Sequence, residues 1–329
     1  MDEAAAILVD WGTSNLRVWA VGPDGKVKSQ ANSDAGMRTL DRSAFPLKLD
    51  DILAQLSTGT EDVPIVMCGM VGSRQGWVEA PYQNVPASFD KLIGAAKRID
   101  GLNGRDIRIL PGLARINPDL PDVMRSEETQ LLGLQAMGCF GSTSGDHLVC
   151  MPGSHAKWAI ADDVKVKDFH TAITGELIAA IISGTVLRHA FGNLTKLPDI
   201  DAGDDTFIAA VDHGLRNPTG ILNAIFATRP RTLLSDADVV QSAAWLSGSV
   251  IGHDVAAALH RWKKRPQMIL LGGGKQGPLY QAALQRAGVR PSYVDADEAS
   301  IAGLLKAACT LWPSRFEAPV SGAMELSIE

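Results

Sequence analysis

Two glycine-containing turns constrain the fold of this chain more than any other feature. The first, Asp10-Trp11-Gly12-Thr13-Ser14, follows the apolar run Ile7-Leu8-Val9, and the second, Met151-Pro152-Gly153-Ser154-His155, follows Leu148-Val149-Cys150. Each turn leads into another apolar run with a tryptophan near its middle, and then into an acidic turn and a third, alternating run. The sequence therefore predicts a module of three strands that occurs twice, once near the start of each of two domains.

Turns of this composition are suited to binding phosphate. Gly, Ser and Thr allow backbone N–H groups and hydroxyls to point to one place, where an anion can accept their hydrogen bonds. Two such turns, one in each domain, would hold a polyphosphate from both sides. The residues predicted to contact phosphate are Gly12, Thr13, Ser14, Gly153, Ser154, His155 and Lys157.

The bulk properties indicate an ordinary globular protein of two domains. The 329 residues exceed the usual size of a single core, and 46% of them are hydrophobic and 21% charged. The net charge is −6, so a solvated helix end is favoured over a nucleic-acid contact for the basic cluster Arg261–Arg265. No apolar run approaches the roughly 18 residues of a membrane span, and the acidic start is unlike a signal peptide. We therefore expect a cytoplasmic protein without nucleic-acid or membrane partners.

The four cysteines, at positions 68, 139, 150 and 309, do not have the spacing of a metal site. Cys68 and Cys150 fall within apolar strand runs and are interpreted as small core residues. This cysteine usage supports a reducing compartment.

Hydrophobic periodicity predicts an α/β chain in two halves. The first half has strands near 6–10, 15–21, 26–33, 65–68 and 107–110, and helices near 43–57, 88–98 and 127–137. The second half has strands near 147–151, 156–162, 164–170, 268–271 and 292–295, and helices near 174–190, 204–214, 218–228, 236–261, 278–287 and 298–312. The segment 138–145 is the best linker candidate. We therefore predict domains at 1–140 and 141–312, followed by a tail at 313–329.

Asp10 ends an apolar strand directly before the first turn. A carboxylate at this point could hold Mg²⁺ through water, against phosphates that are being transferred. The alternative is an aspartate that only begins a turn. The presence of the second turn downstream favours the metal role.

Glu127 and Glu128 open a helix, and Ser126 is positioned as its N-cap. Acidic residues in a first turn are favoured by the helix dipole alone, so this pattern does not require a catalytic role. The functional interpretation is a general base that takes a proton from a substrate hydroxyl, which contributes about 10²–10⁴ in rate. The position just before the linker, where a cleft would form, favours the catalytic interpretation.

The segment Gly272-Gly273-Gly274-Lys275-Gln276-Gly277 matches G-x-G-x-x-G after an apolar strand, and Asp295 ends the next strand. This pattern is typical of dinucleotide-binding proteins. Only about 50 residues follow Gly277, however, and a doubly wound nucleotide domain needs several further strand–helix units. We therefore interpret Gly272, Gly273 and Gly274 as a turn that lets backbone approach a planar or phosphorylated ligand.

The loop Gly69–Trp77, with Tyr82 beyond it, combines glycines, a hydroxyl, a cation and an aromatic ring. That mixture suits a polar substrate, and Arg74 could meet a carboxylate. A surface hairpin is an equally good interpretation of the same residues. The chain has no G-x-x-x-x-G-K-[ST], G-x-S-x-G or H-E-x-x-H motif.

In their order, these motifs resemble those of the sugar-kinase, hexokinase, actin and Hsp70 superfamily. Its members carry a first phosphate loop, a catalytic carboxylate, a second phosphate loop and an adenosine loop. Here that order is met by residues 10–17, Glu127 or Glu128, residues 152–157 and residues 272–274. The resemblance implies two ribonuclease-H-like domains of the actin-like ATPase type, an interdomain cleft, and ATP with its adenine against the last of these turns.

The chain is more closely similar to the 2-dehydro-3-deoxygalactonokinase family, over nearly its whole length. The segments that carry the similarity are DWGTSNLR, CGMVGSRQGW, APYQNVPA, MRSEETQLLG, MPGSHAKW and TAITGEL. The resemblance implies ATP-dependent phosphorylation of the C6 hydroxyl of 2-dehydro-3-deoxy-D-galactonate. It also implies a cleft that closes over both substrates.

Under this resemblance Glu127 is the first choice for the base, because its distance to Gly133 fits slightly better, and Glu128 is the second. The predicted substrate-binding residues are Asn15, Arg17, Met70, Gly72, Ser73, Arg74, Trp77 and Tyr82. Two other functions stay open: a kinase of another 2-keto-3-deoxy sugar acid, such as the gluconate-derived epimer, and a non-catalytic ATP-binding regulator. The sequence also leaves self-association open.

Overall fold

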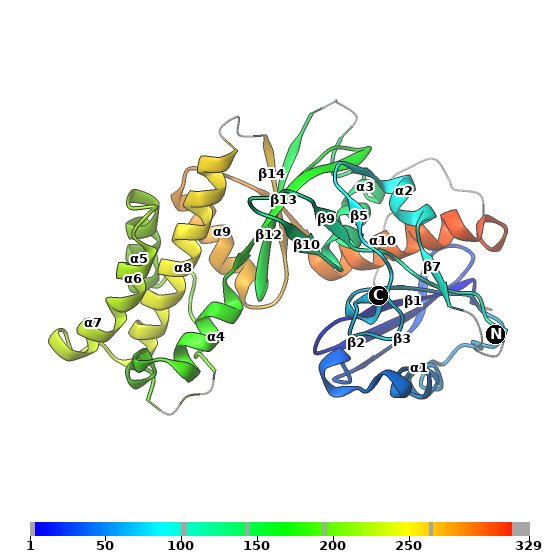
Figure 1. Ribbon diagram of the computed structural model, residues 1–329, viewed down its shortest axis with the longest axis horizontal. Coiled ribbons are helices and arrows are strands. Elements are labelled where there is room, and N and C mark those ends of the chain that lie inside the picture. The colour runs from blue at the N-terminus through cyan, green and yellow to red at the C-terminus, as the bar shows by residue number, and fades with distance from the viewer. Residues whose placement is uncertain are drawn as a thin grey trace. The chain divides into compact units, whose positions relative to one another are not determined.

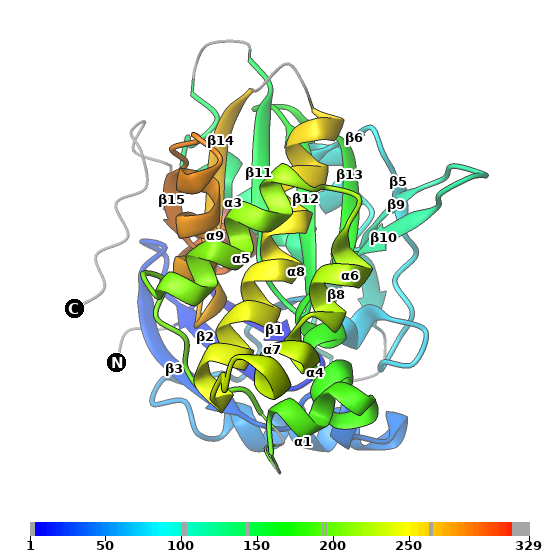
Figure 2. The ribbon, with the colours of Figure 1, turned by 90° about the vertical axis from the view of Figure 1, so that its left-hand side faces the viewer.

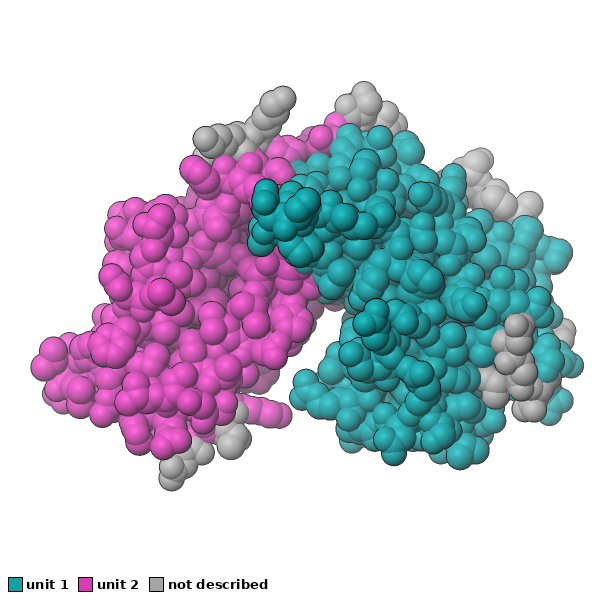
Figure 3. All heavy atoms as spheres, in the orientation of Figure 1, with its two compact units in different colours: residues 1–144, 160–169, 296–329 teal, residues 145–159, 170–295 magenta. Residues whose placement is uncertain are grey.

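The chain forms a mixed α/β protein whose computed structural model describes residues 4–99, 104–141, 145–192, 194, 196–262 and 266–317. It divides into two compact units, which Figure 3 shows in different colours. Unit 1 consists of residues 1–144, 160–169 and 296–329, and unit 2 of residues 145–159 and 170–295. The α/β class predicted from the periodicity is confirmed.

Unit 1 is built on a six-stranded sheet of order β3-β2-β1-β4-β8-β7 (Figure 1). The strands are β1 (Ala6–Trp11), β2 (Leu16–Val21), β3 (Val27–Ser33), β4 (Ile65–Cys68), β7 (Lys97–Ile99) and β8 (Ile107–Ile109). The first three strands form an antiparallel meander, whereas β1, β4 and β8 are parallel. The parallel register sets Asp10 beside Cys68, so the carboxyl ends of β1 and β4 lie at the same edge.

The helices of unit 1 are α1 (Phe45–Leu53), α2 (Phe89–Gly94), α3 (Glu127–Ala136) and α10 (Ala296–Leu311). A small second sheet, of order β10-β9-β5, consists of Asp122–Met124, Leu113–Arg115 and Gln83–Asn84. The core packs Trp11 against Phe45, whose ring centroids lie 4.9 Å apart. The helix α10, drawn in orange in Figure 1, lies along α3 although 159 residues, 137–295, lie between them in sequence.

Glycines allow α3 and α10 to approach closely. A Cβ placed on Gly133 would lie 1.9 Å from the carbonyl oxygen of Ala299, and one placed on Gly303 would lie 2.0 Å from that of Thr129. Any side chain at either position would therefore push the two backbones apart.

The third sheet has the order β15-β14-β11-β12-β13-β6. Its strands are β6 (Ala87–Ser88), β11 (His147–Met151), β12 (His155–Ala161), β13 (Lys165–Ile173), β14 (Gln267–Gly272) and β15 (Ser292–Asp295). Strands β11, β14 and β15 are parallel, and the divisions between the two units fall within β12 and β13. The meander β1-β2-β3 thus has its counterpart in β11-β12-β13, which confirms the predicted repeat.

The helices of unit 2 are α4 (Gly175–Gly184), α5 (Asp205–Arg216), α6 (Ile221–Phe226), α7 (Thr228–Leu234), α8 (Val239–Arg261) and α9 (Gln276–Arg286). Figure 2 shows α5 and α8 side by side in front of the sheet strands. Asp238 begins α8 with a capping box to Gln241, which satisfies two backbone donors at this helix end. Short 3₁₀ helices cover Met37–Thr39, Arg42–Ala44, Met70–Gly72, Val186–Ala190 and Pro313–Arg315.

Some predicted boundaries are wrong. The helix expected at 88–98 ends at Gly94, and its last residues belong instead to β7, which pairs with β8. The helix expected at 174–190 breaks at Thr185, and the one expected at 218–228 is followed by a further helix, α7. The short strands β5, β6, β9 and β10 were not expected, because two or three residues carry little periodicity, whereas β8, also of three residues, falls in the strand expected near 107–110.

The compact units do not follow chain order, whereas the predicted domains do. The first break, at 144/145, lies inside the expected linker, but residues 160–169 and 296–329 return to unit 1. Residues 142–144 of that linker, residues 263–265 of the basic cluster and residues 318–329 of the tail lie outside the described residues. Among the helices described, none is long and apolar enough to cross a membrane.

Candidate active site

The first predicted phosphate turn connects β1 to β2. Its Gly12 N–H donates to the Asn15 carbonyl at 2.9 Å, which closes the turn. The carbonyls of Gly12 and Thr13 accept from the N–H groups of Met37 and Arg38, at 3.0 and 3.1 Å. The segment after β3 therefore supports the turn from behind, while the side chains of Ser14 and Asn15 are exposed.

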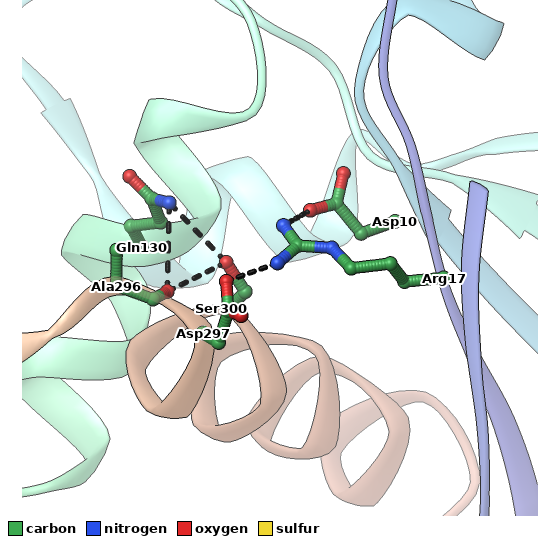
Figure 4. A network of polar contacts seen from close by, with 6 residues as sticks. All are labelled: Asp10, Arg17, Gln130, Ala296, Asp297 and Ser300. Carbon is green, nitrogen blue, oxygen red and sulfur yellow. Dashed lines mark hydrogen bonds and ion pairs between the residues drawn. The ribbon is translucent and has the colours of Figure 1, made fainter. Parts of the chain in front are cut away.

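Asp10 is 6% exposed at the end of β1 and forms an ion pair with Arg17, whose Nη2 lies 2.5 Å from Asp10 Oδ2. The Nη1 of Arg17 pairs with Asp297, in the first turn of α10 (Figure 4). Burial opposes the charge on the Arg17 guanidinium, but the two carboxylates outweigh it and raise the pKa of Arg17. Arg17, which the sequence predicts to bind substrate, here forms ion pairs with Asp10 and Asp297.

Glu127 and Glu128 begin α3 and turn back onto the backbone before it. Oε2 of Glu127 accepts from the Arg125 N–H at 3.0 Å, and Oε1 of Glu128 accepts from the Ser126 N–H at 3.1 Å. Ser126 is the N-cap residue of α3, as predicted, but it has φ +95° and its side chain makes no capping hydrogen bond. The two glutamates satisfy neighbouring donors instead.

Glu128 is fully buried, whereas Glu127 is partly exposed. Burial, and then the nearby Glu127, raise the pKa of Glu128 to about 8, although Arg125 opposes the rise. The Oε2 of Glu128 has no hydrogen-bond partner among the described residues. A carboxyl with this pKa is mostly protonated at neutral pH.

Gly69 allows the end of β1 and the start of α3 to lie close together. Gly69, which follows β4 with φ +95°, has room for no side chain: a Cβ there would lie 2.6 Å from the Trp11 carbonyl oxygen and 2.9 Å from Ser126 Oγ. Burial raises the pKa of the Cys68 thiol, and the nearby Asp10 and Glu128 raise it further. The predicted metal carboxylate and the predicted base therefore lie at one place in unit 1.

The predicted substrate loop lies beside the same helix start. Gly72 and Ser73 are buried, and a Cβ on Gly72 would lie 2.8 Å from Nη1 of Arg125. Met70 is half-buried, and Trp77 stacks on Phe45 of the core. The Arg74 side chain is 82% exposed and pairs with Glu79 at 3.6 Å.

Arg125 is a cation of this loop region that the sequence interpretation passed over. It is 7% exposed, its Nη2 donates to the Ala80 carbonyl at 2.7 Å, and its guanidinium lies 4.5 Å from the ring centre of Tyr82. Its Nε and Nη1 have no hydrogen-bond partner among the described residues. The signal that could have identified it is its position two residues before the acidic pair.

The second predicted phosphate turn, in unit 2, lies against the start of α4. The Gly153 carbonyl accepts from Thr174 Oγ1 at 3.2 Å, and the Ser154 carbonyl accepts from the Glu176 N–H at 3.1 Å. His155 pairs with Glu176 through Nε2. Lys157 is buried and its Nζ donates to the His155 carbonyl at 3.1 Å.

The predicted adenosine turn lies near this second turn. Gly272 is buried against the Tyr293 ring, and Gly273 and Gly274 are exposed, with Gly274 at φ +54°. A Cβ on Gly175 would lie 2.7 Å from Nε2 of Gln276 and 3.0 Å from the Gly153 carbonyl oxygen. The second phosphate turn and the glycine-rich turn therefore meet at Gly175, a residue that the sequence interpretation did not assign to the site.

A buried carboxylate lies behind the second turn. Oδ2 of Asp254, on α8, accepts from Trp158 Nε1 at 3.1 Å and from Tyr280 Oη at 2.7 Å. Tyr280 also hydrogen bonds with Thr174, which holds Gly153. Burial raises the pKa of Asp254 to about 6, although both donated bonds oppose the rise.

The residues at Asp10 fit a magnesium ion that is held mainly by other ligands. No three His, Cys, Asp or Glu side chains of the described residues gather as a metal site. Magnesium usually takes one or two carboxylates together with water and substrate phosphates. Asp10 provides one such carboxylate beside the first turn, and Arg17 binds only its Oδ2.

Comparison with known proteins identifies the family. The family described as 2-keto-3-deoxy-galactonokinase matches residues 10–307. The chain belongs to the 2-keto-3-deoxy-galactonokinase family. It is 43% identical over 306 residues to "Probable 2-dehydro-3-deoxygalactonokinase DgoK1" of Rhizobium meliloti (strain 1021), with 93% of this chain and 97% of that protein covered. It is 34% identical over 303 residues to 2-dehydro-3-deoxygalactonokinase of Escherichia coli (strain K12), covering 92% and 96%.

Solved structures agree with this family. A crystal structure from Sinorhizobium meliloti, assigned as a 2-dehydro-3-deoxygalactonokinase, superposes with a TM-score of 0.87 at 42% identity, covering 94% of this chain and 99% of that one. At the level of the fold alone, the activator of 2-hydroxyisocaproyl-CoA dehydratase from Clostridium difficile has a TM-score of 0.50 at 12% identity, covering 97% and 99%. The resemblance inferred from the sequence, to a sugar-acid kinase with an actin-like ATPase fold, is confirmed.

Proposed function

We propose that this member of the 2-keto-3-deoxy-galactonokinase family transfers the γ-phosphoryl of ATP to the C6 hydroxyl of 2-dehydro-3-deoxy-D-galactonate. The product is 2-dehydro-3-deoxy-6-phospho-D-galactonate. The observation that supports this best is the meeting of Asp10, Glu127 and Glu128 at the ends of β1 and β4. The family relatives are named for the same activity.

In this proposal Glu127 orients the attacking hydroxyl and takes its proton. Glu127 is partly exposed, so a substrate can reach it. Glu128 is fully buried with a pKa near 8, so at neutral pH it is largely protonated and is a poor proton acceptor. Glu128 would instead hold the Ser126 N–H and keep the start of α3 in place.

Each turn offers groups for ATP. In unit 1 the hydroxyls of Thr13 and Ser14 would donate hydrogen bonds to phosphate oxygens; in unit 2 the hydroxyl of Ser154 would do the same, and Gly273 and Gly274 would leave space for adenine. Magnesium at Asp10 would neutralise charge on the transferring phosphoryl group. Because phosphoryl transfer depends mostly on positioning and electrostatics, the turns should matter as much as the base.

The substrate loop would bind the sugar acid. Ser73 and Arg125, beside the Glu127 helix, have buried polar atoms that find no hydrogen-bond partner in the described part of the chain, whereas Arg74 extends into solvent. We include Asn15, Met70, Gly72, Trp77 and Tyr82 in this proposed subsite, and we propose a cytoplasmic location for the enzyme.

The test is a coupled assay of ATP consumption with a panel of 2-keto-3-deoxy sugar acids and aldonates. We expect the highest kcat/KM with 2-dehydro-3-deoxy-D-galactonate. A preference for the gluconate-derived epimer would change the substrate, and no stimulated turnover with any compound would favour a regulator.

The base assignment is tested by Glu127→Gln and Glu128→Gln. We expect Glu127→Gln to lower kcat by about 10²–10⁴ while ATP still binds. A larger loss in Glu128→Gln than in Glu127→Gln would move the base to Glu128.

A further inference from the structure

One guanidinium is shared by two carboxylates from opposite ends of the chain. Arg17, on β2, contacts Asp10 through Nη2 and Asp297 through Nη1 (Figure 4). Asp10 is buried, with a side chain 8% exposed, whereas that of Asp297 is 64% exposed. Asp297 was not assigned to the site from the sequence, where it is only an acidic residue at a helix start.

The helix that carries Asp297 is fixed against the helix that carries Glu127. Gly133 and Gly303 let the backbones of α3 and α10 touch. Gln130 Nε2 donates to Ser300 Oγ at 3.3 Å and contacts the Ala296 carbonyl at 3.5 Å, and Ser300 Oγ donates to that same carbonyl at 2.9 Å (Figure 4). The first turn of α10 therefore contacts both the Asp10 strand pair and the α3 helix.

The charges of this group do not cancel. Asp10 and Asp297 carry two negative charges and Arg17 carries one positive charge, which leaves one net negative charge. Without Asp297, the charge of Arg17 would cancel that of Asp10. A divalent cation beside Asp10 would then no longer be attracted by a net negative charge.

We propose that Asp297 is a positioning residue for Asp10: it shares the Arg17 guanidinium, and so leaves the Asp10 carboxylate negative enough to hold a divalent cation next to the nucleotide. This inference rests on the proposed metal role of Asp10. The competing explanation is that Asp297 only stabilises the start of α10 through the helix dipole, as an acidic first-turn residue does.

The chain offers a matched control. Glu298 is the other acidic residue in the first turn of α10, so Glu298→Gln removes the same charge from the same turn. If Asp297 acts only on the helix dipole, Asp297→Asn and Glu298→Gln should behave alike.

The test measures Mn²⁺ binding by electron paramagnetic resonance in the presence of a non-hydrolysable ATP analogue, without sugar acid. We expect Asp297→Asn to weaken Mn²⁺ binding about three- to ten-fold and Glu298→Gln to change it less than about two-fold. The double variant Arg17→Gln/Asp297→Asn again has one net negative charge, so binding should return to within about two-fold of the unmodified protein. Thermal unfolding of each variant is measured to check that it is folded.

Equal effects of Asp297→Asn and Glu298→Gln, or no recovery in the double variant, would overturn the proposal. No loss of Mn²⁺ binding in Asp10→Asn would overturn it together with the metal role of Asp10. If the expected pattern holds but no sugar acid is phosphorylated, the inference stands and the proposed reaction fails.

Discussion

At the scale of single residues, the start of α3 holds a carboxyl group in an unfavourable environment. Glu128 is fully buried beside Glu127. Its Oε1 accepts hydrogen bonds from the Ser126 N–H and the Thr129 hydroxyl, whereas its Oε2 has no partner among the described residues. Its pKa is about 8 in the folded protein and near 4.5 without burial. Such a perturbed group in a cluster of carboxylates is typical of a functional site.

This shift predicts a pH-dependent stability. Because the folded protein binds the Glu128 proton more tightly than the unfolded chain, the free energy of unfolding should fall as the pH rises from about 4.5 to 8. Between pH 6 and 8 the contribution is about 2 kcal/mol. Denaturant titrations of the unmodified protein and Glu128→Gln at both pH values measure it. We expect the decrease in stability over this interval to be about 2 kcal/mol smaller in the variant.

Asp254→Asn is the control for this measurement, and its decrease in stability between pH 6 and 8 should stay close to that of the unmodified protein. Burial raises the pKa of Asp254 only to about 6, so its contribution should change mainly below pH 6. An equal decrease between pH 6 and 8 in the unmodified protein and Glu128→Gln would contradict the assignment of the shift to Glu128.

At the scale of elements, close helix packing determines where the site residues lie. The two glycine contacts let α3 and α10 touch along their backbones, and the same two helices carry Glu127 and Asp297. Of these two helices, α10 falls in residues 141–312, which the sequence assigns to the second domain, although it belongs to unit 1. If Glu127 has the proposed role, the packing of these helices should affect both stability and activity.

We expect Gly133→Ala to lower the free energy of unfolding by about 1–3 kcal/mol, because the new Cβ meets a backbone carbonyl that cannot rotate away. It should also lower kcat, since α3 must shift. Gly94→Ala, at the last residue of α2, is the control, because beyond its chain neighbours and its own helix backbone no described atom lies within 4 Å of its Cβ position. Chemical denaturation and steady-state kinetics of both variants test this. A Gly133→Ala protein as stable and active as Gly94→Ala would show that the helices adjust without cost.

At the scale of the whole molecule, unit 1 is assembled from three separate segments. Its last segment contains α10, which buries Leu304 and Leu305 and returns to the N-terminal sheet after all of unit 2. Unit 1 therefore cannot form completely from residues 1–144.

We predict that a chain ending at Asp295 loses the cooperative unfolding of unit 1. Amide hydrogen exchange in α3 and β4 should then rise to nearly the rate of an unfolded chain, because α10 covers both elements. A chain ending at Glu317 keeps every contact described above and is the control. Protected amides in α3 of the shorter chain would show that α10 is dispensable for unit 1.

Much of the fold could be predicted because it is encoded locally. The apolar runs at Ile7–Val9 and Leu148–Cys150 and the turns after them predict the repeated meander, and the helical spacing of apolar residues in 43–57 predicts α1. The association of Asp10 with the acidic pair could be proposed only from motif order. The two-residue strands β5 and β6 could not be predicted, because they are defined by pairing with segments elsewhere in the chain.

The sequence by itself determined the chemistry that is available: two glycine turns, an aspartate after a buried strand, two glutamates at a helix start and a late glycine-rich turn, in the order of a sugar-acid kinase. The tertiary structure decided which groups share an environment. It buried Glu128 but left Glu127 accessible, placed Arg17 between Asp10 and Asp297, and exposed Arg74 while burying Arg125. The physical reason is that charge state and accessibility depend on burial and on neighbours distant in sequence, which no local pattern contains.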